Sequence, residues 1–176
     1  MKALLTRKIR PIQIFAFAAL FAIAGATTPT FAQNPHGKTF KDWKAHCNSA
    51  TGAPAVCVLV QDVAFKKSRK RILQFLIRYL PGTTTLIGDI ILPLGIYLPS
   101  GVTMQIDDGQ TFEIPVEICS DGRMRGCRAR FSFDDALLAS VKSGAKAIIT
   151  FQDARQTPVP VPVSLAGFTA GLKAIQ

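Results

Sequence analysis

Apolar and polar residues alternate through nearly all of the sequence after residue 32. One row places four apolar side chains on a single face: Phe112, Ile114, Val116 and Ile118. Similar rows occupy residues 73–79 and 126–133. Because successive side chains of a strand point to opposite sides, this pattern predicts antiparallel strands that bury one face and expose the other.

Further strands are expected where the pattern returns, near residues 39–48, 55–65, 84–92, 102–108, 146–153 and 157–164. Residues that favour tight turns separate several of them: Pro81-Gly82, Asp107-Asp108-Gly109 and Asp121-Gly122. Many short strands at this spacing predict a mainly β fold, either an antiparallel β-sandwich or a partly closed barrel. A chain of 176 residues that is 48% apolar can bury the core of one such domain.

From Pro158 to Val163 the chain alternates strictly between proline and valine. Residues two apart direct their backbone N–H groups to the same side of a strand, so the three prolines remove the donors from one edge. This predicts an edge strand that is protected against the addition of further strands. A polyproline ligand for a partner domain is the alternative, and the regularly spaced valines favour a strand with one buried face.

The first of two expected helices lies near residues 134–142. Asp134 and Asp135 stand at its start, where acidic side chains are favourable, and Gly144 follows its last turn as the expected C-cap. Apolar residues at helical spacing within it predict one buried face.

The second expected helix lies near residues 165–175, with Ser164 as its N-cap. Gly167 and Gly171 are four residues apart in this segment. Because a helix of this length is too short to span a bilayer, we interpret the two glycines as a site of close helix–sheet packing and not as a membrane dimer motif.

Residues 1–32 have the organisation of a secretory signal peptide. Four basic residues precede an apolar stretch from Ile12 to Ala26: Lys2, Arg7, Lys8 and Arg10. We expect cleavage after Ala32, which leaves residues 33–176 as a single β-rich domain and reduces the formal net charge of +10 by four. A retained membrane anchor is the alternative, but the apolar stretch is short for a span of about 20 residues. Export would place the protein in the periplasm, at the outer membrane or outside the cell.

All four cysteines follow the predicted cleavage site: Cys47, Cys57, Cys119 and Cys127. An even number of cysteines in an oxidising compartment predicts two disulfides, for which three connectivities exist. We favour the local pairs, Cys47–Cys57 and Cys119–Cys127, because each closes a short loop between neighbouring strands. A zinc site is the alternative, but neither pair has the usual spacing of zinc ligands. We expect no metal and no cofactor.

The sequence contains no recognisable catalytic motif, and we expect the protein not to be an enzyme. His36 lies close to the predicted new N-terminus, where we expect disorder. His46 lies within a predicted strand, and a structural role is expected for it. Asp107 and Asp108 belong to a predicted turn, and adjacent strand residues face opposite ways, which makes this pair unsuited to joint acid–base catalysis.

Two clusters of basic residues stand out. Five lie in one connection between predicted strands: Lys66, Lys67, Arg69, Lys70 and Arg71. Four more surround the predicted Cys119–Cys127 hairpin: Arg123, Arg125, Arg128 and Arg130. The first cluster is a candidate site for binding an anionic surface such as lipid headgroups, lipopolysaccharide or acidic glycans. The alternative is a solvated loop that keeps the protein soluble. We expect no nucleic acid partner, because the chain is exported and these charges lack an aromatic stacking platform.

An ordered set of residues resembles the invasion-associated locus B (IalB) family of exported alphaproteobacterial proteins. It comprises Trp43, Cys47, Cys57, Leu92-Pro93-Leu94-Gly95, Gly101-Val102, Ile106-Asp107, Cys119, Gly126-Cys127 and Ser164-Leu165-Ala166-Gly167-Phe168. The resemblance implies a β-rich envelope-associated or secreted protein, in a family whose founding members are linked to bacterial entry into host cells, notably erythrocytes. It carries over no catalytic residues, and the Lys66–Arg71 cluster matches no family motif.

Two functions follow from these observations as hypotheses. The first is an exported, non-enzymatic envelope or secreted protein that binds a host-cell surface or an envelope component during host invasion. The second is a periplasmic accessory or chaperone-like module that supports other envelope proteins.

Overall fold

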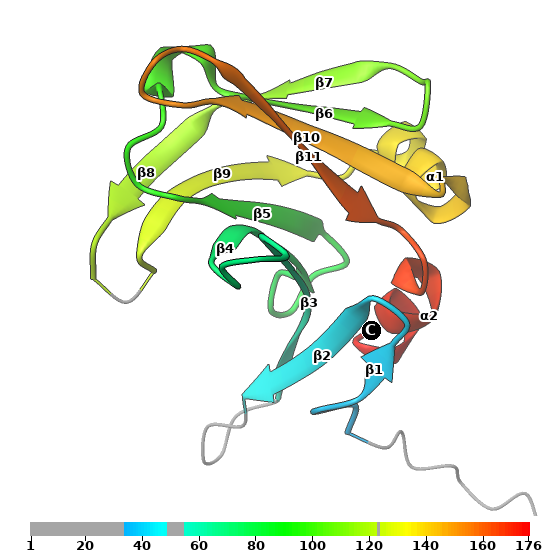
Figure 1. Ribbon diagram of the computed structural model, residues 1–176. Coiled ribbons are helices and arrows are strands. Elements are labelled where there is room, and N and C mark those ends of the chain that lie inside the picture. Colours follow the sequence, from blue (N-terminus) through cyan, green and yellow to red (C-terminus); the bar gives the residue numbers. More distant parts are fainter. Residues whose placement is uncertain (1–33, 49–54, 123) are drawn as a thin grey trace, which may run out of the picture. The chain divides into compact units, whose positions relative to one another are not determined.

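Two antiparallel sheets pack against each other as a sandwich (Figure 1). The computed structural model describes residues 34–48, 55–122 and 124–176, which belong to one compact unit, Gln33–Gln176. The larger sheet has the strand order β1-β2-β3-β4-β5-β9-β8, and the smaller sheet has the order β11-β10-β6-β7. Neither sheet closes into a barrel within these residues, so the sandwich is the observed one of the two predicted architectures.

Strands make up most of the regular structure. In chain order they are Thr39–Phe40 (β1), Trp43–Asn48 (β2), Val56–Ala64 (β3), Arg71–Tyr79 (β4), Leu86–Leu92 (β5), Val102–Ile106 (β6), Thr111–Ile114 (β7), Val116–Ser120 (β8), Gly126–Ser132 (β9), Lys146–Gln152 (β10) and Pro158–Ser164 (β11). The helical segments of the described residues are a short 3-10 helix, Leu98–Ser100 (η1), and two α-helices, Asp135–Ser143 (α1) and Phe168–Ala174 (α2).

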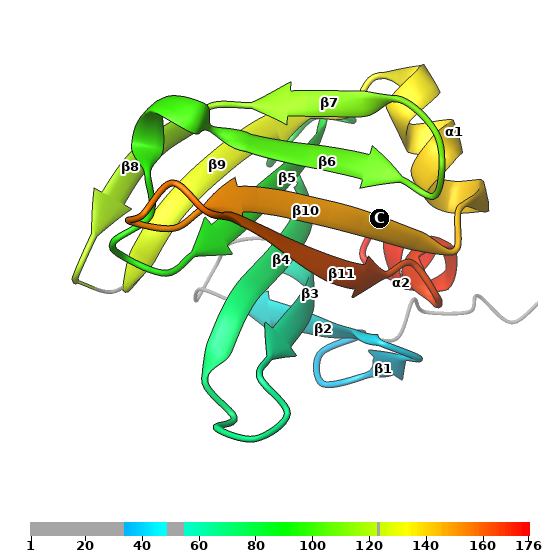
Figure 2. The same cartoon turned by 45° about the horizontal axis from the view of Figure 1, so that its top comes forward.

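The strand β11 lies at one edge of the smaller sheet, as its prolines predict (Figure 2). Pro158, Pro160 and Pro162 are exposed, whereas Val161 and Val163 are buried. The opposite edge of β11 is paired, as predicted, because this strand pairs with β10 over its whole length. Its proline-bearing edge therefore cannot donate backbone hydrogen bonds to an added strand.

Five aromatic side chains form a closed ring of contacts in the core. Trp43 on β2 lies with its ring centroid 5.6 Å from Phe75 on β4 and 5.5 Å from Phe168 on α2. Phe131 and Phe133 complete the ring, with centroid distances of 6.0 Å (Phe75–Phe131), 5.0 Å (Phe131–Phe133) and 6.4 Å (Phe133–Phe168). Aromatic pairs at such distances stabilise by about 0.5–1.5 kcal/mol beyond their burial. The ring fastens the C-terminal helix to the larger sheet.

The expected strand over residues 39–48 is divided in two. Its first part, β1, ends at Phe40, and Lys41 and Asp42 form a tight turn before β2 begins at Trp43. Lys41 adopts a φ of 52° in this turn, a backbone conformation that a continuous strand does not use. The two parts pair with each other in antiparallel fashion, with Phe40 opposite Trp43.

The single strand expected over residues 111–118 is wrong. Pro115 separates β7 from β8, and the chain passes there from the smaller sheet to the larger one. Proline lacks the N–H that an uninterrupted ladder would need at this position. A bulge between Val116 and Ile118 then shifts the register, so that Ile118 is 49% exposed and does not share the buried face of Ile114.

The first helix, α1, agrees with its prediction. The Asp134 carboxylate accepts a hydrogen bond from the backbone N–H of Leu137 at 2.7 Å, which caps the helix, and Gly144 is the C-cap. Leu137 and Val141 are buried on its inner face. None of the helices in the described ranges is both long and apolar enough to cross a membrane.

The second helix, α2, begins later than predicted, and its N-cap is Gly167 instead of Ser164. Ser164 is the last residue of β11, because its backbone stays paired with Lys146 of β10. The expected close packing is present. A Cβ atom at Gly167 would collide with the backbone carbonyl of Phe40, and one at Gly171 would lie 2.6 Å from a methyl carbon of the fully buried Leu59.

Candidate functional site

The connection between β3 and β4, Phe65–Lys70, together with Arg71 forms a surface that we call the basic tip. It lies at the bottom of the view in Figure 2, away from the smaller sheet. All five basic residues singled out in the sequence are exposed here: Lys66, Lys67, Arg69, Lys70 and Arg71. Two backbone hydrogen bonds shape the turn, from Phe65 N–H to the Lys70 carbonyl (3.0 Å) and from Arg69 N–H to the Phe65 carbonyl (2.9 Å).

The basic tip also carries an aromatic side chain that the sequence analysis missed. Phe65 is 54% exposed, although it directly follows the last residue of β3. It was missed because a Phe at the end of a strand is normally assigned to the core. The feature of the sequence that indicates its exposure is its position directly before a run of basic residues. An exposed aromatic ring beside several cations suits the boundary between water and lipid acyl chains.

One carboxylate is paired with the basic tip. Arg71 Nη1 lies 3.8 Å from Asp62 Oδ1, and both side chains are exposed. The same carboxylate accepts a hydrogen bond from Gln74 Nε2 at 2.9 Å. Exposed ion pairs of this kind contribute about 0–1 kcal/mol. Within the described residues, the other four basic side chains of the tip form no ion pair, so the tip presents a concentrated positive charge to solvent.

The described residues of the second predicted basic cluster, Arg125, Arg128 and Arg130, do not present one exposed positive surface, because Arg128 and Arg130 are half-buried. Arg123 lies outside the described residues. Arg128 and Arg130 are directed to carboxylates of the larger sheet: Arg130 bonds Asp89, and Arg128 Nη2 bonds Glu117 at 3.2 Å. Arg125, in the turn before β9, remains as an exposed cation.

Both disulfides join residues that lie directly opposite each other on neighbouring strands. Cys47 on β2 is bonded to Cys57 on β3, and Cys119 on β8 is bonded to Cys127 on β9. The structure therefore has the local pairing that the sequence favours. Each disulfide closes a hairpin whose strands are already paired through their backbones.

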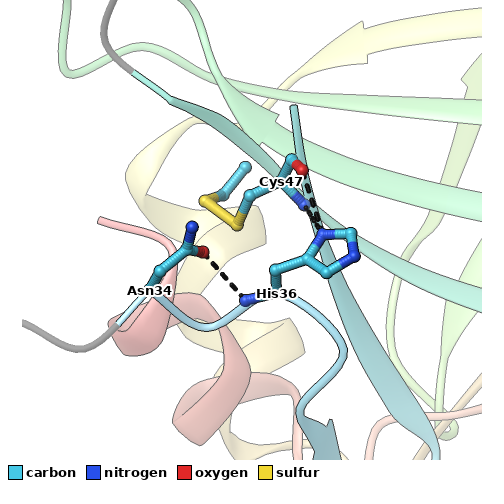
Figure 3. Close-up of a disulfide and its surroundings, with 4 residues drawn as sticks. Asn34, His36 and Cys47 are labelled. Atoms are coloured by element: carbon cyan, nitrogen blue, oxygen red, sulfur yellow. Dashed lines mark hydrogen bonds between the residues drawn. A yellow bond between two sulfur atoms is a disulfide. The ribbon is translucent and has the colours of Figure 1, made fainter. Parts of the chain in front are cut away.

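His36 is ordered, so the disorder expected for it is wrong (Figure 3). Its Nδ1 lies 3.0 Å from the backbone nitrogen of Cys47 and 2.9 Å from the Cys47 carbonyl oxygen. In the tautomer with the proton on Nε2, Nδ1 accepts the Cys47 N–H, and in the tautomer with the proton on Nδ1 it donates to the Cys47 carbonyl. The ring of His46 packs edge-on against that of His36, with centroids 6.0 Å apart. These contacts fasten the segment before β1 to β2.

A cleft with a volume of about 690 Å³ lies between the β4–β5 turn, α1 and α2. Its titratable side chains are Tyr79, Asp135, Lys142 and Lys173, above an apolar floor. Burial raises the pKa of the Tyr79 hydroxyl. No two of these four side chains are hydrogen-bonded to each other in the described part of the chain.

Comparison with known proteins gives a consistent family. The family model described as "Invasion associated locus B (IalB) protein" matches residues 43–176. An invasion protein B homolog of Brucella abortus (strain 2308) is 30% identical over 165 residues, which cover 92% of each chain. Invasion protein B of Bartonella bacilliformis is 24% identical over 181 residues, covering 92% of this chain and 94% of that protein. These matches confirm the resemblance drawn from the ordered sequence motifs.

A solved structure has a similar fold. The crystal structure of invasion associated protein B from Bartonella henselae matches with a TM-score of 0.68 and 21% sequence identity. The match covers 78% of this chain and 92% of the Bartonella chain. The two-sheet architecture is thus shared with that protein.

Proposed function

The chain belongs to the invasion associated locus B protein family, and from this membership we propose that it is an exported, non-enzymatic envelope or secreted protein that attaches to an anionic host-cell surface through its basic tip. The relatives are named as invasion proteins, which supports a role in contact with host cells. The proposed location is the periplasm, the outer membrane or the outside of the cell, after removal of residues 1–32.

The observation that carries this proposal is the composition of the basic tip. The basic tip combines five exposed cations with the exposed Phe65, and one of the cations, Arg71, is paired with the exposed Asp62 carboxylate. Each basic residue held at an anionic membrane contributes about 1 kcal/mol, and the contribution falls with added salt. An aromatic side chain at such a site adds apolar contact with the interface.

Two further features support export. Disulfides persist in oxidising compartments and are rare where thiols are kept reduced. Both disulfides close hairpins of the larger sheet, so they stabilise the sheet that bears the basic tip. The expected signal peptide agrees with this location.

The test compares two variants of equal net charge. In the tip variant, Lys66, Lys67, Lys70 and Arg71 become Gln and Arg69 becomes Asn, because Asn tolerates the φ of 58° found there. In the control variant, five exposed basic residues elsewhere become Gln: Lys44, Lys142, Lys146, Arg155 and Lys173. Binding to vesicles of phosphatidylcholine and phosphatidylglycerol at low salt is measured by co-sedimentation, and binding to host cells by flow cytometry.

The tip variant should bind anionic vesicles about three to four orders of magnitude more weakly than the native protein, with an unchanged melting temperature. The control variant should lose far less. Equal binding by the two variants would reject the basic tip as the attachment site. If crosslinking in intact cells then recovered an envelope protein, the accessory function would replace the one proposed here.

A further inference from the structure

A small hollow lies beside the basic tip, at the end of the larger sheet. Its volume is about 330 Å³. Two arginines line it, Arg71 at the start of β4 and Arg125 in the turn before β9. Between them lies an apolar floor formed by Ile72, Ile91, Leu92, Pro93 and Leu94. None of the described residues that line the hollow is acidic.

Strand register explains why residues so distant in the sequence meet here. In the larger sheet β5 lies between β4 and β9, with Ile91 opposite Gln74 on one side and Leu92 opposite Cys127 on the other. The start of β4 and the start of β9 therefore flank the end of β5. Gly126 keeps the approach close, since a Cβ atom there would collide with the Leu92 carbonyl oxygen.

The two arginines have little competing negative charge. Arg71 has its loose, exposed contact with Asp62 at 3.8 Å. Arg125 has no ion-pair partner among the residues that the structure describes. A guanidinium group presents paired donors that match the oxygens of a phosphate, and two of them around one hollow favour a bound phosphate over a larger anionic protein surface.

An exposed apolar side chain, Leu94, borders the hollow. Leu94 is 50% exposed at its edge, whereas Ile91 in its floor is buried. Leu94 follows the end of β5, and Phe65, which is similarly exposed, follows the end of β3. These two strands run parallel to each other on either side of β4, so both side chains lie at the same end of the larger sheet. Cations above an apolar floor with a projecting leucine match the chemistry of a phospholipid, whose phosphate lies next to its glycerol and acyl chains.

We propose that the hollow between Arg71 and Arg125 binds the headgroup of one anionic phospholipid molecule, with the phosphate between the two guanidinium groups and Leu94 against the acyl chains. This inference rests on the proposed function, because it assigns a lipid to the membrane contact made by the basic tip. It adds a defined site to an attachment that otherwise depends on charge density.

The experiment isolates this site with a monomeric lipid, which carries no membrane surface potential. Dihexanoyl phosphatidylglycerol, below the concentration at which it forms micelles, is titrated into the full, disulfide-bonded protein, and amide chemical shifts are followed by NMR. Arg125→Asn removes one guanidinium and tolerates the φ of 48° at this position. Arg125→Lys keeps the charge but loses the paired donors. Arg155→Asn, in the β10–β11 turn, is the matched control.

The native protein should show saturable shifts at the amides of Ile91, Leu94 and Arg125. Arg125→Asn should weaken binding by about tenfold or more, and Arg125→Lys by a smaller factor. Leu94→Ser should weaken binding of the lipid, and glycerol phosphate, which lacks acyl chains, should bind much more weakly than the lipid. Arg155→Asn should bind like the native protein.

Several outcomes would overturn the inference. These are shifts located elsewhere in the protein, equal binding by the native protein and Arg125→Asn, or glycerol phosphate binding as tightly as the lipid.

Vesicle binding by the tip variant is measured separately, so that the two proposals can fail independently. If the tip variant loses vesicle binding while Arg125→Asn binds the short-chain lipid normally, the proposed function stands and the lipid site is wrong. If Arg125→Asn loses the short-chain lipid while the tip variant binds vesicles normally, the basic tip is wrong.

Discussion

Arg130 on β9 lies directly opposite Asp89 on β5 and donates two hydrogen bonds to its carboxylate, from Nε at 2.6 Å and from Nη2 at 3.1 Å. Two further arginines approach the same carboxylate, with Arg78 Nε at 3.8 Å and Arg128 Nε at 3.9 Å. Asp89 is 7% exposed, so one buried carboxylate balances three guanidinium groups. The hydrogen bond from Arg130 to Asp89 raises the pKa of Arg130.

Asp89→Asn should therefore destabilise the protein by about 2–4 kcal/mol, because it removes the countercharge of the partly buried Arg78 and Arg130 and leaves Arg128 with Glu117 alone. The comparison is Asp62→Asn, which removes the exposed partner of Arg71 and should cost less than about 1 kcal/mol. Urea unfolding of both variants measures the difference. Equal costs for the two substitutions would show that the Asp89 cluster contributes no more than an exposed ion pair.

The proline-bearing edge of β11 retains the backbone N–H of its last residue, and a side chain of the larger sheet accepts a hydrogen bond from it. Ser164 follows the same alternation as Pro158, Pro160 and Pro162, and its N–H donates to Gln61 Oε1 at 3.0 Å. Gln61 Nε2 in turn donates to the Ser164 carbonyl at 2.8 Å. Gln61 is a buried residue of β3, so its amide joins the two sheets through a reciprocal pair of hydrogen bonds.

Gln61→Met should destabilise the protein by about 1–3 kcal/mol, because the side-chain volume is kept while the Ser164 N–H loses its acceptor. Gln74→Met serves as the control, since the Gln74 side chain donates to the exposed Asp62 carboxylate, and its cost should stay within about 0.5 kcal/mol. Thermal unfolding of the two variants side by side tests this. A cost for Gln61→Met as small as that of the control would mean that water replaces the amide without loss.

The alternation of residues predicts β4, β9 and β11 well, because one buried face is sufficient to determine the side on which every residue of a strand lies. It does not predict the division at Pro115. Whether a proline ends a strand or bends it toward another sheet depends on the strands available on either side, which local sequence does not describe. The same limit applies to Ser164, whose place in β11 depends on its pairing with β10.

The candidate site is predictable only in part, for the same reason. The run Lys66–Arg71 is contiguous, so the sequence reveals the basic tip directly. The register of β4, β5 and β9 determines that Arg71 and Arg125 lie at the same hollow. It also determines that Arg128 and Arg130 lie next to carboxylates. The sequence without that register does not distinguish which basic residues near the second hairpin are exposed and which are paired.

Substitutions at two glycines with positive φ allow the cost of backbone strain to be measured apart from the cost of disturbing close packing. Gly167 has a φ of 89° and faces the Phe40 carbonyl, where a Cβ atom would collide, whereas Gly82 has a φ of 73° with nothing within 4 Å. Gly82→Ala should cost about 1–2 kcal/mol from its backbone conformation alone. Gly167→Ala should cost at least about 3 kcal/mol, because α2 must also move away from β1. Chemical denaturation of both variants measures the costs, and similar values would show that the helix can shift freely.

The Asp107 carboxylate links the β6–β7 turn to the start of β10 and should make stability depend on pH. It accepts backbone hydrogen bonds from Ala145 at 3.0 Å and from Lys146 at 3.0 Å. Both bonds lower the pKa of the Asp107 carboxyl, and the bond from Ala145 has the larger effect. Because the folded state favours the ionised form, its stabilisation is complete above the unfolded-state pKa of about 4 and is lost as the pH falls through the lower folded-state pKa.

Asp107→Asn is therefore expected to be less stable than the native protein at pH 6, and the difference should shrink as the pH falls below about 4. Asn tolerates the φ of 48° at this position, so the substitution removes the charge without adding backbone strain. Asp108→Asn, in the same turn, removes a neighbouring charge that makes no hydrogen bond to Ala145 or Lys146. Unfolding free energies of the three proteins across this pH range give the test. A constant difference between the native protein and Asp107→Asn would show that the carboxylate acts by shape alone, since only an ionisable acceptor loses its advantage on protonation.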